Sequence, residues 1–291
     1  FTVRRVLYFY SLIIVELSYS LFITYLHYEI SIMSQTLATV ITGASSGIGE
    51  ALARQLAAKE KQALVLVARR QEKLENLAAE LRTKHGVRVE VIGLDLEQVG
   101  AATQLVKAVD ALGLSIDMLI NNAGFGLNDN FGDMAIDRVQ GMMQLNMVAL
   151  TELTHAVLPS MRERKQGRIM NIASVAAFQA CPNFAVYGAT KSYVLMFSEA
   201  LAAEEKKNGI KVIAVCPGAT ATAFHDVAGN HGTFLTKIMD TPETVAKTAL
   251  CAMKCGCPMV VTGLLNKPLP YIVRLIPRQC MTWMAGKLAA R

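Results

Sequence analysis

The sequence lacks the features that mark several classes of protein. It has no low-complexity stretch and no block of consecutive Lys and Arg residues interleaved with aromatics, so we expect neither a disordered protein nor a nucleic-acid binder. It also has no internal repeat and no linker that would start a second domain. The formal net charge of +6 therefore suits another anionic partner, such as a phosphorylated cofactor or a membrane surface.

Cysteine is too sparse for a disulfide scaffold. Six cysteines are spread over 291 residues, which is typical of reduced thiols and predicts a cytoplasmic location. Cys251, Cys255 and Cys257 lie close together in the chain, but no His or fourth Cys nearby completes a tetrahedral set of ligands. We therefore predict no metal site.

The N-terminal segment, residues 1–32, differs from the rest of the chain. Positions 6–26 are apolar and aromatic, with Glu16 as their one charge, and this length would cross a bilayer as a membrane anchor. A cleaved signal peptide is a weaker interpretation, because no small-x-small cleavage site follows. The third interpretation is a non-native extension, since Met33 stands just upstream of the first predicted strand. The anchor and the extension both stay open.

Residues 33–265 alternate between strand-length apolar runs and amphipathic helix-length stretches. This alternation predicts an α/β fold: a single Rossmann-like, doubly wound parallel sheet of about seven strands with helices on both faces. Such sheets bind ligands at the carboxyl ends of their strands. The predicted strands are 37–42, 63–68, 87–94, 116–121, 168–173, 211–216 and 259–262, and the predicted helices are 49–59, 71–85, 98–112, 137–164, 186–208 and 242–254.

A glycine-rich turn joins the first predicted strand to the first predicted helix. The run T-V-I-T-G-A-S-S-G-I-G ends at Gly49, so the turn contains Gly43, Ser45, Ser46, Gly47, Ile48 and Gly49. Glycines let the backbone approach a pyrophosphate closely, and the free N–H groups of the helix start then face it. The spacing is not that of G-x-G-x-x-G, and a turn of this kind alone is also compatible with a purely structural connection.

Two arginines follow the second predicted strand. An NAD site usually has an acidic residue there to bind the ribose 2′-hydroxyl, whereas Arg69 and Arg70 suit the 2′-phosphate of NADP(H). The alternative is that one or both only solvate a helix start, with Glu72 as a salt-bridge partner.

A tyrosine and a lysine lie four residues apart in the second half of the chain. Tyr187 and Lys191 fall on one face of a predicted helix, which by itself is a weak signal. Ser174 lies thirteen residues before Tyr187, and Asn146 lies within the preceding long predicted helix. Together they form a set of four polar residues that includes a candidate proton donor.

These motifs, in this order, resemble the short-chain dehydrogenase/reductase family over residues 38–262. The resemblance implies an NADP(H)-dependent oxidoreductase that interconverts a ketone or aldehyde and an alcohol. It assigns catalysis to Asn146, Ser174, Tyr187 and Lys191, with Lys191 also bonding the nicotinamide ribose and Asn146 holding a water. It further implies that the cofactor contacts Asp95, Leu96, Asn122, Ala123, Gly124, Tyr187, Pro217, Gly218, Thr220 and Thr222.

The chemistry of carbonyl reduction accounts for these residue types. A proton must reach the carbonyl oxygen, and a phenol with a pKa near 10 is poorly matched to neutral pH. We expect the ammonium of Lys191, assisted by the positive nicotinamide ring when the cofactor is oxidised, to lower the pKa of Tyr187, and Ser174 to orient the substrate oxygen. For Asn146, the alternative is a hydrogen bond within its own helical turn.

The last part of the chain offers further interpretations. Residues 223–239 are long enough for a substrate lid, and His225 and His231 within them are most simply surface residues. Residues 266–291 form a basic amphipathic tail that associates with a membrane, covers an apolar substrate pocket, or docks on the domain or a second subunit. Docking is favoured, because Pro270 and Pro277 break any long amphipathic helix.

Two broader predictions complete this interpretation. The resemblance implies a homo-oligomer, a dimer or tetramer, whose partner is a small-molecule carbonyl or alcohol substrate. The alternative function is a non-catalytic nucleotide-sensing or scaffold protein on the same fold.

Overall fold

The computed structural model describes residues 36–222, 224 and 239–289. The interpretations of residues 1–32, of His225 and His231, and of the substrate lid at 223–239 (apart from residues 224 and 239) lie outside these described residues.

The core of the protein is one parallel sheet. Its seven strands lie in the order β3-β2-β1-β4-β5-β6-β7, and every pairing is parallel. The strands are β1 (Thr36–Thr42), β2 (Ala63–Ala68), β3 (Val89–Gly93), β4 (Leu114–Asn121), β5 (Gly167–Ile172), β6 (Ile210–Cys216) and β7 (Met259–Val261). The predicted Rossmann-like sheet is thus confirmed.

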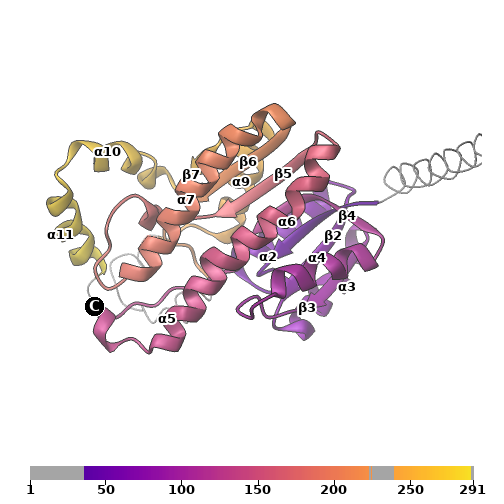
Figure 1. Cartoon of the computed structure of the whole chain (residues 1–291), viewed down its shortest axis with the longest axis horizontal. Coiled ribbons are helices and arrows are strands. Elements are labelled where there is room, and N and C mark those ends of the chain that lie inside the picture. Colours follow the sequence, from indigo (N-terminus) through magenta and orange to yellow (C-terminus); the bar gives the residue numbers. More distant parts are fainter. Residues whose placement is uncertain (1–35, 223, 225–238, 290–291) are drawn as a thin grey trace, which may run out of the picture.

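Helices cover both faces of the sheet (Figure 1). On one face, α2 (Gly47–Lys59), α3 (Gln71–His85) and α9 (Pro242–Cys255) pack on Ile41 and Leu66. On the other face, α4 (Ala101–Ala111), α6 (Leu150–Glu163) and α7 (Ala185–Glu205) cover the strand residues that alternate with these, such as Val40 and Val65. Strands buried on both sides read as continuous apolar runs, which is why the sequence located them well.

The strand order changes direction beside β1. The chain runs outward from β1 through β2 to β3, then returns to the other side of β1 to form β4. The connections that leave the carboxyl ends of β1 and β4 therefore diverge, and a crevice opens there. The glycine turn after β1 and the Asn122–Gly124 turn after β4 both lie at this point.

Two predicted helix boundaries were wrong, and one predicted helix is interrupted. The helix predicted at 98–112 begins only at Ala101, because Gly100 adopts a left-handed conformation with φ of 80°. The helix predicted at 186–208 changes to a 3-10 turn at Lys206 and stops before Gly209. The helix predicted at 137–164 consists of α5 (Ile136–Met143), the π-helical segment η2 (Gln144–Ala149) and α6.

The C-terminal tail forms two short helices, α10 (Leu269–Leu275) and α11 (Arg278–Ala289). Pro277 separates them, whereas Pro270 lies in the first turn of α10, where proline is tolerated. α11 docks on the domain through buried Met281 and through Gly286, which faces Pro182. Within the part of the chain that the structure describes, no helix is both long and apolar enough to cross a membrane.

Candidate active site

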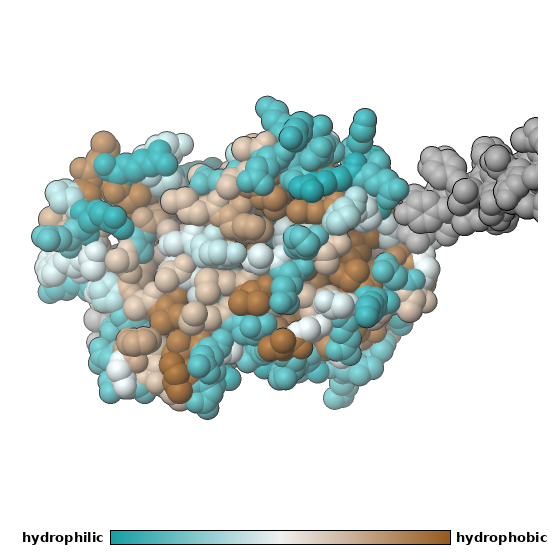
Figure 2. Space-filling model, in the orientation of Figure 1, coloured by the Kyte–Doolittle hydropathy of each residue, from teal (hydrophilic) through white to brown (hydrophobic). Residues whose placement is uncertain are grey.

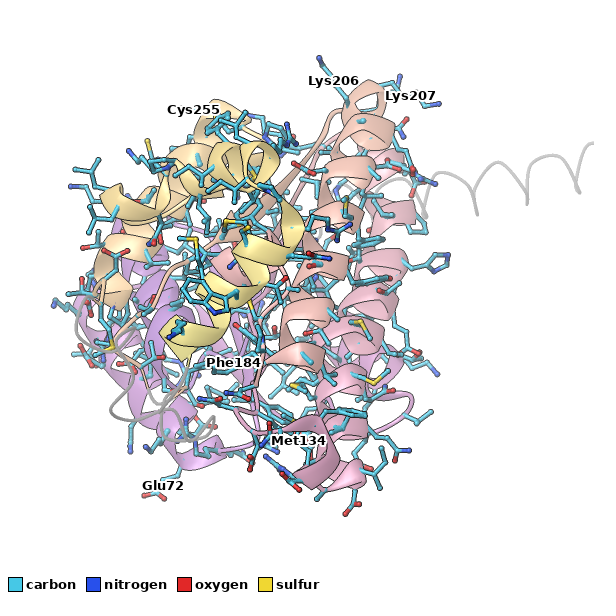
Figure 3. The ribbon with its side chains drawn as sticks, turned by 90° about the vertical axis from the view of Figure 1, so that its left-hand side faces the viewer. Glu72, Met134, Phe184, Lys206, Lys207 and Cys255 are labelled. Carbon is cyan, nitrogen blue, oxygen red and sulfur yellow. The ribbon has the colours of Figure 1, made fainter. Side chains whose placement is uncertain are left out.

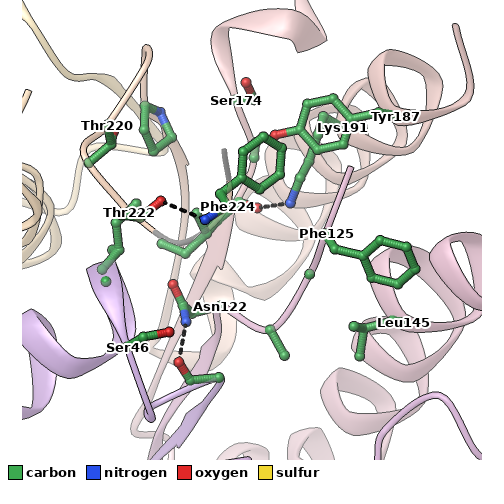
Figure 4. A pocket seen from close by; sticks show the side chains of 18 of the residues that line it. Ser46, Asn122, Phe125, Leu145, Ser174, Tyr187, Lys191, Thr220, Thr222 and Phe224 are labelled. Atoms are coloured by element: carbon green, nitrogen blue, oxygen red, sulfur yellow. Dashed lines mark hydrogen bonds between the residues drawn. The ribbon is translucent and has the colours of Figure 1, made fainter. Parts of the chain in front are cut away.

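A pocket of about 510 Å³ occupies the crevice at the carboxyl ends of the strands. The structure brings nearly all the predicted residues together around it, and Figure 4 shows part of this lining. Two predicted residues, Gly49 and Asn146, do not line the pocket. The predicted residues that line the pocket are Gly43, Ser45, Ser46, Gly47, Ile48, Arg69, Arg70, Asp95, Leu96, Asn122, Ala123, Gly124, Ser174, Tyr187, Lys191, Pro217, Gly218, Thr220 and Thr222.

The glycine turn is packed so closely that side chains would not fit. A methyl group added at Gly49 would lie 2.5 Å from the Gly43 carbonyl oxygen, and one added at Gly43 would lie 2.9 Å from the Ala123 backbone. Gly47, with φ of 59°, faces Thr222 across the pocket. No side chain caps the N-terminus of α2 at Ser46. The first amides of α2 therefore remain available to an anion in the pocket.

The two predicted phosphate-binding arginines have different surroundings. Arg70 Nη2 donates to Ser45 Oγ at 3.0 Å and to Ser46 Oγ at 2.9 Å, so its guanidinium lies over the glycine turn. Arg69 instead forms a salt bridge with Glu97 at 2.8 Å. The carboxylate that pairs with this arginine is thus Glu97 rather than Glu72.

Asparagines brace the other side of the crevice. The side chain of Asn122 donates to the carbonyl oxygens of Thr42 and Gly43, so it ties the turn after β4 to the glycine turn (Figure 4). Asn121 donates to Asn171 Oδ1 at 2.9 Å, and Asn171 in turn donates to Ser198 Oγ on α7. This buried chain of hydrogen bonds joins β4, β5 and the helix that carries Tyr187 and Lys191.

Ser174, Tyr187 and Lys191 converge at one end of the pocket (Figure 4). Lys191 Nζ donates to the Ile172 carbonyl oxygen at 2.8 Å and lies 5.8 Å from the centre of the Tyr187 ring. Burial lowers the pKa of Lys191 to about 8. Burial also raises the pKa of Tyr187 to about 12, and a hydrogen bond with Ser174 opposes this rise.

The expected lowering of the Tyr187 pKa was therefore wrong for the protein alone. The same low-dielectric environment disfavours both charged forms, the phenolate and the ammonium. At neutral pH the phenol keeps its proton, which is the form that can protonate a carbonyl oxygen.

Asn146 holds the loop after β4 from within the π-helical segment. Its side chain accepts from Phe125 N at 3.1 Å, donates to Phe125 O at 2.9 Å and donates to Thr190 Oγ1 at 3.1 Å. The alternative of a bond within its own turn was wrong, because these partners lie on a loop and on α7. A methyl group at Gly124 would lie 2.8 Å from Asn146 Oδ1, so the loop passes directly over this side chain.

The segment after β6 forms the remaining wall. An isolated bridge pairs Thr220 with Asp240, and Asp240 N donates to the Ala219 carbonyl oxygen at 2.9 Å. Thr222 accepts from Phe224 N at 3.3 Å. Opposite them, the Asp95 carboxylate accepts from Glu97 N at 3.1 Å, as a turn residue does, while it also lines the pocket.

Sequence reasoning missed the apolar end of the pocket. Phe224 packs against Tyr187 with ring centres 5.3 Å apart, and Phe184 lies 5.8 Å from Tyr187 on its other flank. Phe125 follows the predicted Gly124 directly, and Phe224 follows Thr222 by two residues. Their closeness in sequence to these motifs could have identified both as lining residues. No local signal marks the remaining lining residues, which include Leu145, Gln179, Cys181 and Ala285.

Metal-binding side chains do not gather around this pocket. In residues 36–222, 224 and 239–289, no group of three or more His, Cys, Asp and Glu side chains is arranged to hold a metal ion. All six cysteines are described, and each is a free thiol.

Comparisons with known proteins agree with this geometry. The profile of the short chain dehydrogenase family matches residues 38–231. The chain is 33% identical to a ketoacyl reductase of Nostoc sp. over 215 residues, covering 74% of each protein. It is 34% identical to an NADP-dependent 3-hydroxy acid dehydrogenase of Schizosaccharomyces pombe, covering 74% of this chain and 85% of that protein.

A solved structure shares the fold. The short-chain dehydrogenase from Sphingobium yanoikuyae, determined in complex with NADPH, superimposes with a TM-score of 0.72 at 31% identity. The match covers 83% of this chain and 96% of the other.

Proposed function

Because the chain belongs to the short-chain dehydrogenase family, whose members are oxidoreductases, we propose that it interconverts a ketone or aldehyde and an alcohol with NADP(H) as its cofactor. The observation that carries this proposal is the convergence of Ser174, Tyr187 and Lys191 at the end of a pocket whose other end is the glycine turn.

The residues present fit the cofactor. The close packing of Gly43 and Gly49 and the uncapped amides of α2 suit a pyrophosphate. Arg70, with Ser45 and Ser46, provides donors for a 2′-phosphate. When bound, the nicotinamide supplies or accepts the hydride. We assign the adenine to Asp95 and Leu96, and the nicotinamide half to Asn122, Ala123, Gly124, Lys191, Pro217, Gly218, Thr220 and Thr222.

Tyr187 moves the proton in this proposal. In reduction the Tyr187 hydroxyl donates its proton to the substrate oxygen and becomes a phenolate, and in oxidation the Tyr187 phenolate accepts the proton from the alcohol. The Ser174 hydroxyl donates a hydrogen bond to the same oxygen, where negative charge develops. Lys191 binds the cofactor ribose and stabilises the phenolate, and Asn146 positions the loop above Lys191.

The walls around Tyr187 support an apolar substrate. Phe125, Leu145, Phe184 and Phe224 line this end of the pocket. We propose an acyl or steroid ketone, and the name of the Nostoc relative, a ketoacyl reductase, supports the acyl class. Catalytic polar groups within an apolar wall are the usual composition of small-molecule sites.

The proposal is tested by replacing Tyr187 with Phe. We expect NADPH oxidation with a panel of apolar ketones to fall by at least about 10³-fold, because the proton donor is lost, while NADPH binding by fluorescence changes little. Tyr193→Phe, on the same helix but half-exposed, is the matched control and should keep full activity. A Tyr187→Phe variant with most of its activity would refute the assignment. A wild-type protein that binds NADPH but reduces no ketone would support the nucleotide-sensing alternative.

We further propose a cytoplasmic homo-oligomer. The six free thiols support a reducing compartment. An exposed apolar surface on α5, η2 and α7 supports self-association, because monomers seldom leave such surfaces uncovered. This surface, here called the α5–α7 surface, comprises Ile136, Met143, Val148, Tyr193 and Met196.

A further inference from the structure

The C-terminal helices α10 and α11 carry a second set of exposed apolar side chains. Figure 3 looks directly at α10 and α11, and Figure 2 shows hydrophobic side chains gathered over α10 beside hydrophilic ones. These apolar side chains are large and strongly exposed: Leu275 is 83% exposed, Tyr271 69% and Trp283 64%. The 3-10 turn before α10 adds Leu264, which is 80% exposed. We call these four residues the C-terminal apolar surface.

The charged residues that follow Glu243 in the sequence are all basic. No Asp or Glu follows Glu243, whereas seven basic residues do: Lys247, Lys254, Lys267, Arg274, Arg278, Lys287 and Arg291. The rest of the chain carries 22 basic and 23 acidic residues, so these seven account for the whole positive excess. Among the described residues, Lys267, Arg274, Arg278 and Lys287 form no ion pair with a carboxylate. Their charge is thus available to a partner.

One side of α11 packs against the rest of the domain. Met281 is buried, and the Cβ position of Gly286 lies 3.1 Å from the Pro182 side chain. Lys287 Nζ lies 5.1 Å from the centre of the Trp283 ring, so a cation and an exposed aromatic are paired at the surface. The apolar surface is therefore carried on docked helices.

We propose that the C-terminal apolar surface binds an anionic lipid bilayer. Exposed Leu, Tyr and Trp with unpaired Lys and Arg form the combination that partitions into the headgroup region, where aromatic rings are favoured. α10 and α11 are too short to span a bilayer, so they lie along its surface. A second copy of the chain fits less well, because a two-fold contact would bring the same basic residues face to face.

This placement also concerns the pocket. Ala285 of α11 lines the pocket that contains Tyr187, so the bilayer-binding helix forms part of the pocket wall. If the proposed oxidoreductase function holds, an apolar ketone dissolved in lipid would reach the pocket along α11. The membrane test below does not depend on activity, so its failure and that of the proposed function are distinguishable.

The single tryptophan of the sequence provides a local probe. Trp283 is the only Trp, so the intrinsic tryptophan fluorescence of the full chain reports on α11 and not on residues 1–32. With vesicles of phosphatidylcholine and phosphatidylglycerol we expect a blue shift and quenching by brominated lipid. Pure phosphatidylcholine vesicles should give far less of both, and salt should weaken the effect.

Matched variants make the test specific. Arg274→Gln with Arg278→Gln should weaken partitioning about 25-fold, at roughly fivefold per basic residue near an anionic surface. Leu275→Asp should weaken it as well, through lost apolar burial. The controls are Lys206→Gln with Lys207→Gln, two exposed residues of the 3-10 turn that follows α7, both labelled in Figure 3, and Val99→Asp, which is 90% exposed near α4.

Two results would overturn the proposal. One is Trp283 emission that does not respond to anionic vesicles, or that responds equally in the test and control variants. The other is a blue shift that grows with protein concentration without lipid, which would identify a second copy as the occupant of this surface.

Discussion

At the scale of single residues, Arg70 decides cofactor choice in our proposal. It already contacts Ser45 and Ser46, whereas Arg69 is held by Glu97. We expect Arg70→Gln to weaken NADPH binding about 10- to 100-fold, the value of charge-assisted hydrogen bonds to a phosphate, and to leave NADH binding nearly unchanged. Fluorescence titration with both cofactors measures this. Arg69→Gln is the matched control, and an equal loss in both variants would contradict the distinction.

Burial of Lys191 makes the stability of the protein depend on pH. Burial lowers its pKa to about 8 in the folded protein, against an ordinary value of 10.5. Between these values the unfolded chain binds a proton that the folded protein has released, so stability rises with pH in this window. Relative to Lys191→Met, the wild-type free energy of unfolding should increase by about 2 kcal/mol from pH 7.5 to pH 10.

Chemical denaturation at both pH values measures this difference. Burial raises the pKa of Cys216 and of Tyr187 to about 12, so both groups act in the opposite direction at high pH, but both are also present in Lys191→Met and their effect is removed by the comparison. A stability difference that stays constant or falls as the pH rises would show that the ammonium of Lys191 is not disfavoured by burial.

At the scale of elements, the glycine turn and α2 form one unit. A methyl group at Gly49 would meet the Gly43 carbonyl oxygen and the Asn122 side chain, each at 2.5 Å. We expect Gly49→Ala to destabilise the protein by about 1 to 3 kcal/mol through overpacking, and to weaken NADPH binding at least about tenfold as the turn shifts. Thermal unfolding and fluorescence titration measure the two effects.

Gly132→Ala is the control for this substitution. Gly132 is exposed, and among the described residues no atom outside its own turn lies within 4 Å of its Cβ position, so both quantities should remain near those of the wild type. Unchanged NADPH affinity in Gly49→Ala would show that the turn tolerates displacement and does not hold the phosphates.

At the scale of the whole molecule, the α5–α7 surface is the candidate contact between subunits. Met196 is 71% exposed on α7, and Figure 2 shows hydrophobic side chains over α5. We expect Met196→Asp to convert a dimer or tetramer to a smaller species, because a carboxylate in an apolar interface is costly unless it is paired. Light scattering after size-exclusion chromatography measures the mass. Val99→Asp is the control, and a wild-type monomer would contradict the proposal.

Much of the fold and site follows from local sequence. Strands buried on both faces appear as apolar runs, and glycine at Gly43, Gly47 and Gly49 indicates close backbone approach. Helix α9 shows the same agreement: Thr241 caps it, Pro242 opens it and Gly256 ends it in a left-handed conformation. These features were predictable because each depends on residues adjacent in the chain.

Other features depend on contacts between distant residues, and only the tertiary structure decided them. The partner of Arg69 is Glu97 rather than nearby Glu72, and Asn146, in a π-helical segment that interrupts the predicted helix, bonds Phe125 of a distant loop. The pKa of Tyr187 rises because burial is a property of the assembled pocket. The sequence by itself determined the sheet, the glycine turn and the four polar residues. Packing decided the pKa values of Tyr187 and Lys191, the apolar walls of the pocket and the position of α11, because these depend on surfaces that meet only after folding.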